Sequence, residues 1–112
     1  MQGAVARRLS SIREKGAISN SEVADLLGTR AETVSRWNNG HRDPHPSTEQ
    51  LLLELEFIIE LLSDFYEPKE ARLFLYAPQK LLGGQRPADL IKEGKISEVH
   101  RLVNQIRDGV YL

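Results

Sequence analysis

The residues that could carry out chemistry in this chain are few and scattered. It has three histidines and no cysteine among its 112 residues. His41 and His45 lie beside prolines, His100 lies far along the chain, and none has acidic residues at metal-ligand spacing. The pair Gly83-Gly84 lacks the Lys-Ser/Thr that completes a phosphate-binding loop. The pattern therefore gives little support to an enzyme, and we expect no cofactor and no metal.

Polar side chains that suit nucleic-acid recognition are concentrated between positions 29 and 42. Arginine can donate two hydrogen bonds to guanine in the major groove of DNA, while short polar groups contact phosphates. Glu32 could accept from a cytosine amino group, although helix capping is an alternative role for it. The predicted DNA-contacting residues are Thr29, Arg30, Glu32, Thr33, Arg36, Asn39, His41 and Arg42. Each of them alone could instead be a solvated surface residue.

Two short helices joined by a tight turn would position these side chains. Capping boxes of the form Ser/Thr-x-x-Glu are predicted at residues 19–22 and 29–32. The first helix is expected to end at Gly28 and the second near Gly40, because glycine commonly follows the end of a helix. Two capped helices separated by a few residues are typical of a helix-turn-helix.

The spacing of small and apolar residues supports the same motif. A tight helix crossing needs a small residue, here Ala24, and its turn needs a residue that tolerates positive φ, here Gly28. The second helix needs an apolar residue that faces back, here Val34, with Trp37 beside it. The alternative is a helical hairpin that binds no ligand.

The remaining patterns are also helical, and we predict an all-α fold. Apolar spacings of three and four residues predict a helix over residues 5–12 that Gly16 ends. Further helices are expected over residues 69–76, after Pro87, and over residues 96–106.

The longest predicted helix runs over residues 47–66 and is too apolar to be buried on one side only. We interpret it as the core element that joins the two halves of the chain, with a dimer interface as a second possible use. The predicted organisation is a helix-turn-helix region over residues 1–46, a long connecting helix over 47–67, and a small helical domain over 68–112.

Charge is distributed unevenly along these three segments. The net charge is +2 over residues 1–46, −6 over residues 47–67 and +3 over residues 68–112. Attraction to nucleic acid must therefore come from a local patch and not from the molecule as a whole. No apolar run approaches the about 20 residues that span a bilayer, and the first residues lack a secretory pattern, so we expect a cytoplasmic protein.

Val110-Tyr111-Leu112 forms an apolar segment after the predicted helix end at Gly109. Such a segment either folds back on its own core or fills a pocket of a partner, and tyrosine is a favoured anchor in interfaces. Basic residues of the last third of the chain are candidates to face an acidic rim on that partner. The predicted partner-binding residues are Lys80, Arg86, Arg107, Gly109, Val110, Tyr111 and Leu112.

Two stretches resemble a known family. Residues 19–46, including Val34-Ser35-Arg36-Trp37-x-x-Gly40, resemble the Xre-type helix-turn-helix. Residues 77–91, 99–106 and the segment Asp108-Gly109-Val110-Tyr111 resemble the toxin-binding domain of the Xre/MbcA/ParS antitoxins.

The resemblance implies the antitoxin of a type II toxin–antitoxin system. Its partner would be a RES-domain toxin that degrades NAD⁺, with the C-terminal region of the antitoxin occluding the active site of the toxin. The resemblance also implies a homodimer that binds an inverted repeat in the operator of its own operon as a repressor.

Three other interpretations remain open at this stage. A stand-alone transcriptional regulator would use its C-terminal half only to dimerise. An antitoxin without DNA binding would follow if the charge of +2 over residues 1–46 were too weak beside the −6 of the next segment. A small helical enzyme would need a buried polar pocket, which the sequence does not indicate.

Overall fold

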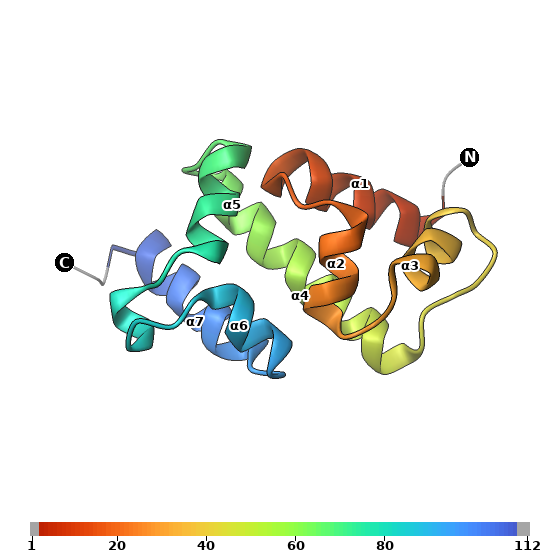
Figure 1. The fold of residues 1–112 in the computed structure, drawn as a ribbon. Helices are drawn as coiled ribbons and strands as arrows, with labels where there is room; N and C mark the ends of the chain where they lie inside the picture. The colour runs from red at the N-terminus through yellow and green to blue at the C-terminus, as the bar shows by residue number, and fades with distance from the viewer. Residues whose placement is uncertain (1–2, 110–112) are drawn as a thin grey trace.

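The structure, a computed structural model, describes residues 3–109, and every regular element in that range is helical (Figure 1). This confirms the predicted all-α fold. The elements are α1 (Ala4–Gly16), α2 (Asn20–Leu27), α3 (Ala31–Asn38), α4 (Pro46–Ser63), α5 (Pro68–Tyr76), the 3₁₀ turn η1 (Lys80–Leu82), α6 (Pro87–Lys92) and α7 (Ile96–Arg107). No helix in the described range is both long enough and apolar enough to cross a membrane.

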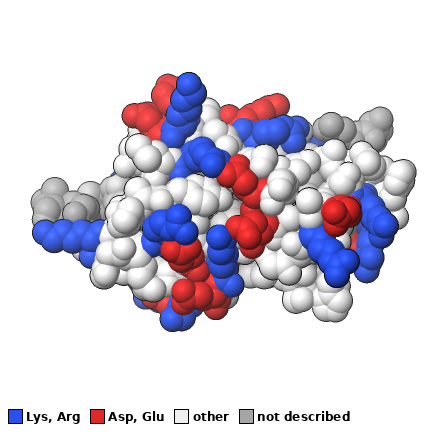
Figure 2. Space-filling model, in the orientation of Figure 1, with Lys and Arg blue, Asp and Glu red and all other residues white. Residues whose placement is uncertain are grey.

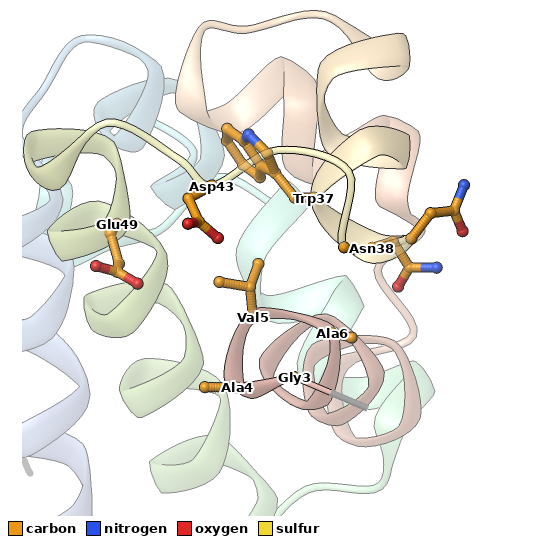
Figure 3. A pocket seen from close by; sticks show the side chains of 10 residues that line it. Gly3, Ala4, Val5, Ala6, Trp37, Asn38, Asp43 and Glu49 are labelled. Atoms are coloured by element: carbon orange, nitrogen blue, oxygen red, sulfur yellow. The ribbon is translucent and has the colours of Figure 1, made fainter. Parts of the chain in front are cut away.

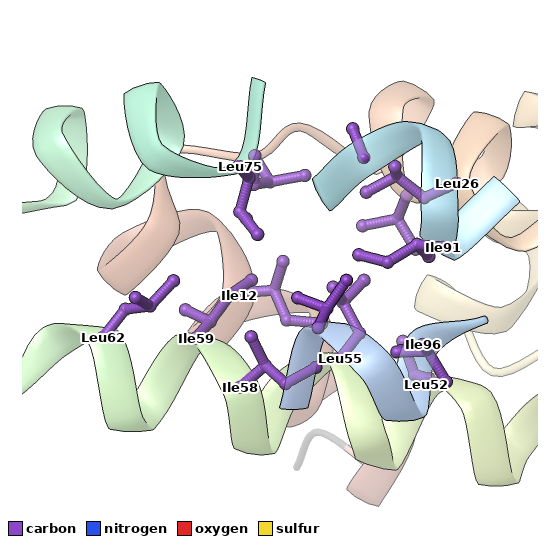
Figure 4. Close-up of a cluster of buried hydrophobic side chains, with 14 of the residues drawn as sticks. Ile12, Leu26, Leu52, Leu55, Ile58, Ile59, Leu62, Leu75, Ile91 and Ile96 are labelled. Atoms are coloured by element: carbon purple, nitrogen blue, oxygen red, sulfur yellow. The ribbon is translucent and has the colours of Figure 1, made fainter. Parts of the chain in front are cut away.

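Helix α4 lies between the other helices and packs against α1 on one side and α7 on the other. Its side chains Leu52, Leu55, Ile58, Ile59 and Leu62 are all fully buried. Figure 4 shows these side chains directed toward apolar residues of other helices. Helices α1 and α2 precede α4 in the chain, and α5, α6 and α7 follow it. The two halves of the chain therefore share one continuous apolar core.

The contact between α1 and α4 is close at the end of α1. A Cβ atom built on Gly16 would lie 3.0 Å from the Cγ2 atom of Ile59, which is fully buried. Helix α1 ends at Gly16, as the sequence predicts, and the residue with left-handed backbone is the next one, Ala17, at φ 53°. Glycine at position 16 thus permits close packing and does not provide the turn.

The ends of α4 differ from the prediction by a few residues. The helix begins at Pro46, since proline at the first position loses no hydrogen bond and its φ already suits a helix. His45 is the N-cap residue, and its Nδ1 accepts from the backbone N–H of Ser47. At the other end, regular helix stops at Ser63 and a turn follows that includes Tyr66.

Candidate binding surfaces

The helix-turn-helix geometry of α2 and α3 is built from local signals. The Ser19 hydroxyl accepts from the backbone N–H of Glu22, and the Glu22 carboxylate accepts from the backbone N–H of Ser19, so the first capping box is confirmed. Gly28 has φ +71° and ends α2. Val34 and Trp37 are buried and direct the opposite face of α3 to solvent.

The second predicted capping box, Thr29 to Glu32, is wrong. The backbone N–H of Thr29 donates to the carbonyl of Ala24 at 2.9 Å and so closes the end of α2. Helix α3 therefore starts one residue later, with Arg30 as an N-cap residue that makes no side-chain capping bond. Because Glu32 then lies at the second helical position, it is out of register for a capping box with Thr29.

The predicted DNA-contacting residues gather at the α3 end of the molecule. Glu32 and Arg36 of α3 and its N-cap residue Arg30 are exposed, and Thr29 and Thr33 are half-buried beside them. The loop after α3 presents Asn39, His41 and Arg42, all exposed.

The cations of this end are available to a ligand. None of Arg30, Arg36 and Arg42 forms an ion pair within residues 3–109. Figure 2 shows mainly basic side chains, with few acidic ones, at the end where α3 lies. Exposed arginines that form no ion pair within the described range suit an anionic partner.

A groove of about 460 Å³ lies between the start of α1, the end of α3 and the loop after α3 (Figure 3). Asp43 and Glu49 line it, so it is unsuited to a phosphate group. Trp37 forms part of its wall, and the indole N–H of Trp37 is buried with no hydrogen-bond partner in the described part of the chain. The groove therefore does not extend the cationic surface.

The predicted partner-binding residues lie toward the other end of the molecule, but their side chains are not all available. Lys80 is exposed and makes no ion pair within residues 3–109. Arg86 is held by two hydrogen bonds to Asp89, at 2.9 and 2.7 Å, and Arg107 contacts Asp108 at 3.1 Å.

The predicted helix end is at the expected place. Gly109 has φ +68° directly after the last turn of α7. Val110, Tyr111 and Leu112 lie outside the described residues.

Two features of the site were missed at the level of sequence. The side chain of Leu73 is 67% exposed, while Ala71, Phe74 and Leu75 of the same helix are buried. Helical spacing could have shown this, because Ala71, Phe74 and Leu75 share a face that Leu73 does not. Phe65, which follows the end of α4, is 39% exposed.

The second feature is an ion pair that joins the two halves of the chain. Arg72 of α5 donates to both carboxylate oxygens of Glu22, at 2.7 and 2.6 Å, and also to the carbonyl of Ala17. The Arg72 hydrogen bond is the largest cause that lowers the pKa of Glu22 to about 2 from 4.5, with the bonds to Ser19 contributing and burial opposing. The guanidinium also lies 5.0 Å from the ring centroid of Tyr76, whose pKa is raised by burial.

Comparison with known proteins identifies the class of protein that carries these surfaces. Residues 60–109 match the family described as the antitoxin Xre/MbcA/ParS C-terminal toxin-binding domain. The chain is 27% identical over 108 residues to the mycobacterial cidal antitoxin MbcA of Mycobacterium tuberculosis, a match that covers 96% of each chain. It is 30% identical over 95 residues to the probable mycobacterial cidal antitoxin Rv3188 of the same species, covering 85% of this chain and 81% of that protein.

A solved structure agrees with these relatives. The crystal structure of the M. tuberculosis MbcT–MbcA toxin–antitoxin complex contains a chain that matches this one with a TM-score of 0.82 and 26% identity, over 98% of this chain and 99% of that one. The chain therefore belongs to the Xre/MbcA/ParS antitoxin family. Its relatives support an antitoxin function with a toxin as partner.

The Arg72–Glu22 pair predicts a specific dependence of stability on pH. Because the folded-state pKa of Glu22 is lowered, its contribution to the free energy of unfolding is complete above about pH 4.5 and is lost as the pH falls toward about 2. Replacing Arg72→Met should make the protein less stable near neutral pH and should reduce the further loss of stability on acidification. Urea unfolding at about pH 7 and about pH 3 measures both effects. Arg101→Met, which removes an exposed arginine outside this network, serves as control, and an equal acid-dependent loss in both variants would contradict the assignment.

Proposed function

We propose that this chain is the antitoxin of a type II toxin–antitoxin system, acting in the cytoplasm on a RES-domain toxin that degrades NAD⁺. The observation that carries the proposal is the match along almost the whole chain to an antitoxin whose structure was solved in complex with its toxin. Neutralisation would be steric: residues toward the C-terminal end would enter the active-site cleft of the toxin. The antitoxin itself would perform no chemistry and would need no cofactor.

The partner-binding residues proposed from the sequence fit this role unequally. Lys80 of η1 and Gly109, which follows α7, are exposed, and η1 and the end of α7 lie toward the end of the molecule opposite α3 (Figure 1), where a partner could reach them. Arg86 contacts Asp89 and Arg107 contacts Asp108 within the chain. On binding a toxin, each arginine would either retain this contact or replace it by a contact with a carboxylate of the toxin. We therefore place most of the expected binding energy on Val110, Tyr111 and Leu112, since a large aromatic anchor contributes more than a surface charge.

We further propose that the α3 end binds operator DNA, as one half of a symmetric dimer that represses its own operon. The exposed residues of α3 support this role, because a recognition helix reads bases with side chains that its own fold does not use. The acidic residues of α4 oppose DNA binding less than the sequence suggests. Glu56 lies 3.6 Å from Arg8 and Glu60 lies 3.1 Å from Lys15, so part of its charge is balanced within the fold.

Deleting Val110–Leu112 tests the toxin-binding proposal. The shortened chain should fold normally but fail to protect cells that express the toxin encoded in the adjacent reading frame, because the segment expected to fill the active site is gone. Cell survival and co-purification of the two proteins measure the effect. Arg36→Ala, which changes only the α3 end, should protect as well as the wild type does. Full protection by the shortened chain would refute the proposed role of this segment.

Substituting Arg36→Ala tests the DNA-binding proposal. If Arg36 contacts a base, the substitution should cost about 1–3 kcal/mol of operator affinity in a gel-shift titration with the upstream region of the operon. Arg101→Ala is the matched control, since Arg101 is an exposed arginine on α7. Binding by the wild type should also weaken steeply as salt is raised. Equal affinities of the two variants for the operator would rule out this role of Arg36.

A further inference from the structure

The end of the molecule opposite α3 carries an unusual share of exposed apolar surface. Among the described residues, four large apolar side chains are exposed: Phe57, Phe65, Leu73 and Leu81. Phe65 lies in the turn between α4 and α5, Leu73 lies in α5, and Leu81 lies in η1. Figure 1 shows the α4–α5 turn and η1 at the end of the molecule that lies away from α3.

The turn between α4 and α5 forms a preformed apolar hollow, which we call the α4–α5 corner. The hollow measures about 310 Å³ and is lined by Tyr66, Glu70, Leu73, Phe74, Ala77 and Gln79. Aromatic contacts fix its floor, because the ring centroids of Phe65 and Tyr66 lie 4.9 Å apart and those of Tyr66 and Phe74 lie 6.1 Å apart.

Hydrogen bonds also hold the wall of the hollow. The side-chain amide of Gln79 donates to the carbonyls of Phe74 and Ala77, at 2.9 and 3.3 Å. The site therefore needs little ordering when a partner binds, and such preorganisation favours affinity.

The charge around the α4–α5 corner indicates the chemistry of its partner. Asp64, Glu67 and Glu70 are exposed there, and none of them forms an ion pair within residues 3–109. Glu67 and Glu70 form a capping box at the start of α5, in which the Glu70 carboxylate accepts from the backbone N–H of Glu67 at 2.8 Å. Lys69, at the start of α5, is an exposed basic residue beside them. The matching surface is an apolar side chain that lies among lysine and arginine residues.

We propose that the α4–α5 corner is a docking site for the toxin, separate from residues 110–112, and that it receives an apolar side chain from a basic patch on the toxin. This inference rests on the proposed antitoxin function. Helix α7 ends toward the same end of the molecule as the α4–α5 corner (Figure 1), so one partner can reach both. Leu73, which lines the hollow, and Phe65, which contacts its lining residue Tyr66, are the anchors of this second site, because both expose apolar surface there.

A second copy of this chain fits the α4–α5 corner poorly. The molecule is 46 Å long, with α3 at one end and this corner at the other. A twofold axis at the corner would place the two α3 helices at the far ends of an assembly nearly twice that length. Dimeric helix-turn-helix proteins that bind two adjacent half-sites of DNA instead place their recognition helices about 34 Å apart. Two copies would also bring their unpaired carboxylates together.

Calorimetric titration of the intact chain with the purified toxin from the adjacent reading frame tests this docking site. Leu73→Ala and Phe65→Ala should each weaken toxin binding about tenfold or more and leave operator binding unchanged, and Leu73→Ala should also leave the thermal midpoint unchanged. Phe57→Ala is the matched control, because Phe57 is a similarly exposed phenylalanine of α4 away from the α4–α5 corner, and it should change affinity less than about twofold.

The outcomes separate this inference from the proposed function. Wild-type binding together with unchanged affinity in both corner variants would overturn the docking site and leave the antitoxin function intact. Equal losses in all three variants would also overturn it, because the effect would not be specific to the α4–α5 corner. Failure of the wild type to bind the toxin at all would overturn the proposed function, and the docking site with it.

Discussion

Burial of apolar side chains along α4 is the interaction on which the rest of the structure depends. Helices from both halves of the chain cover α4, and its buried face forms one cluster with theirs. The ion pairs between the halves, Arg72 with Glu22 and Lys92 with Asp25, are partly exposed and so contribute less to stability than this burial does. Their contribution is orientation: both hold α2, the first helix of the helix-turn-helix, against α5 and α6.

The shared core has a consequence for function. If the two halves fold as one unit, the α3 end and the opposite end keep a fixed separation along the 46 Å length of the molecule. A toxin that covers the α4–α5 corner would leave α3 uncovered. The proposed operator binding and toxin binding are therefore compatible within one complex, and neither surface has to form at the expense of the other.

Local signals in the sequence predicted most of the helices. The capping box at Ser19, the turn at Gly28 and the inward residues Val34 and Trp37 depend on neighbours within a few positions, and the structure confirms them. The false capping box at Thr29 arose because the same residue is needed to close the preceding helix. Competition of this kind depends on backbone geometry and is not visible in a sequence pattern.

The site was less predictable than the fold. The pair of Arg72 and Glu22 joins residues 50 positions apart, so no local pattern could indicate it. Helical spacing puts Leu73 on a different face of α5 from Ala71, Phe74 and Leu75, but tertiary packing decides which of these faces the core covers. The DNA-contacting and toxin-contacting residues stay predictions, since contact with a partner is a property of a complex and not of one chain.

Native-state amide hydrogen exchange across a denaturant series tests the central claim, that one core unites both ends, most directly. We expect the slowest amides of α2, α4 and α7 to exchange with the same free energy of opening and the same dependence on denaturant, as one cooperative unit requires. If the amides of α7 exchange through a separate opening of lower free energy while those of α2 and α4 stay protected, the claim of one shared core is contradicted.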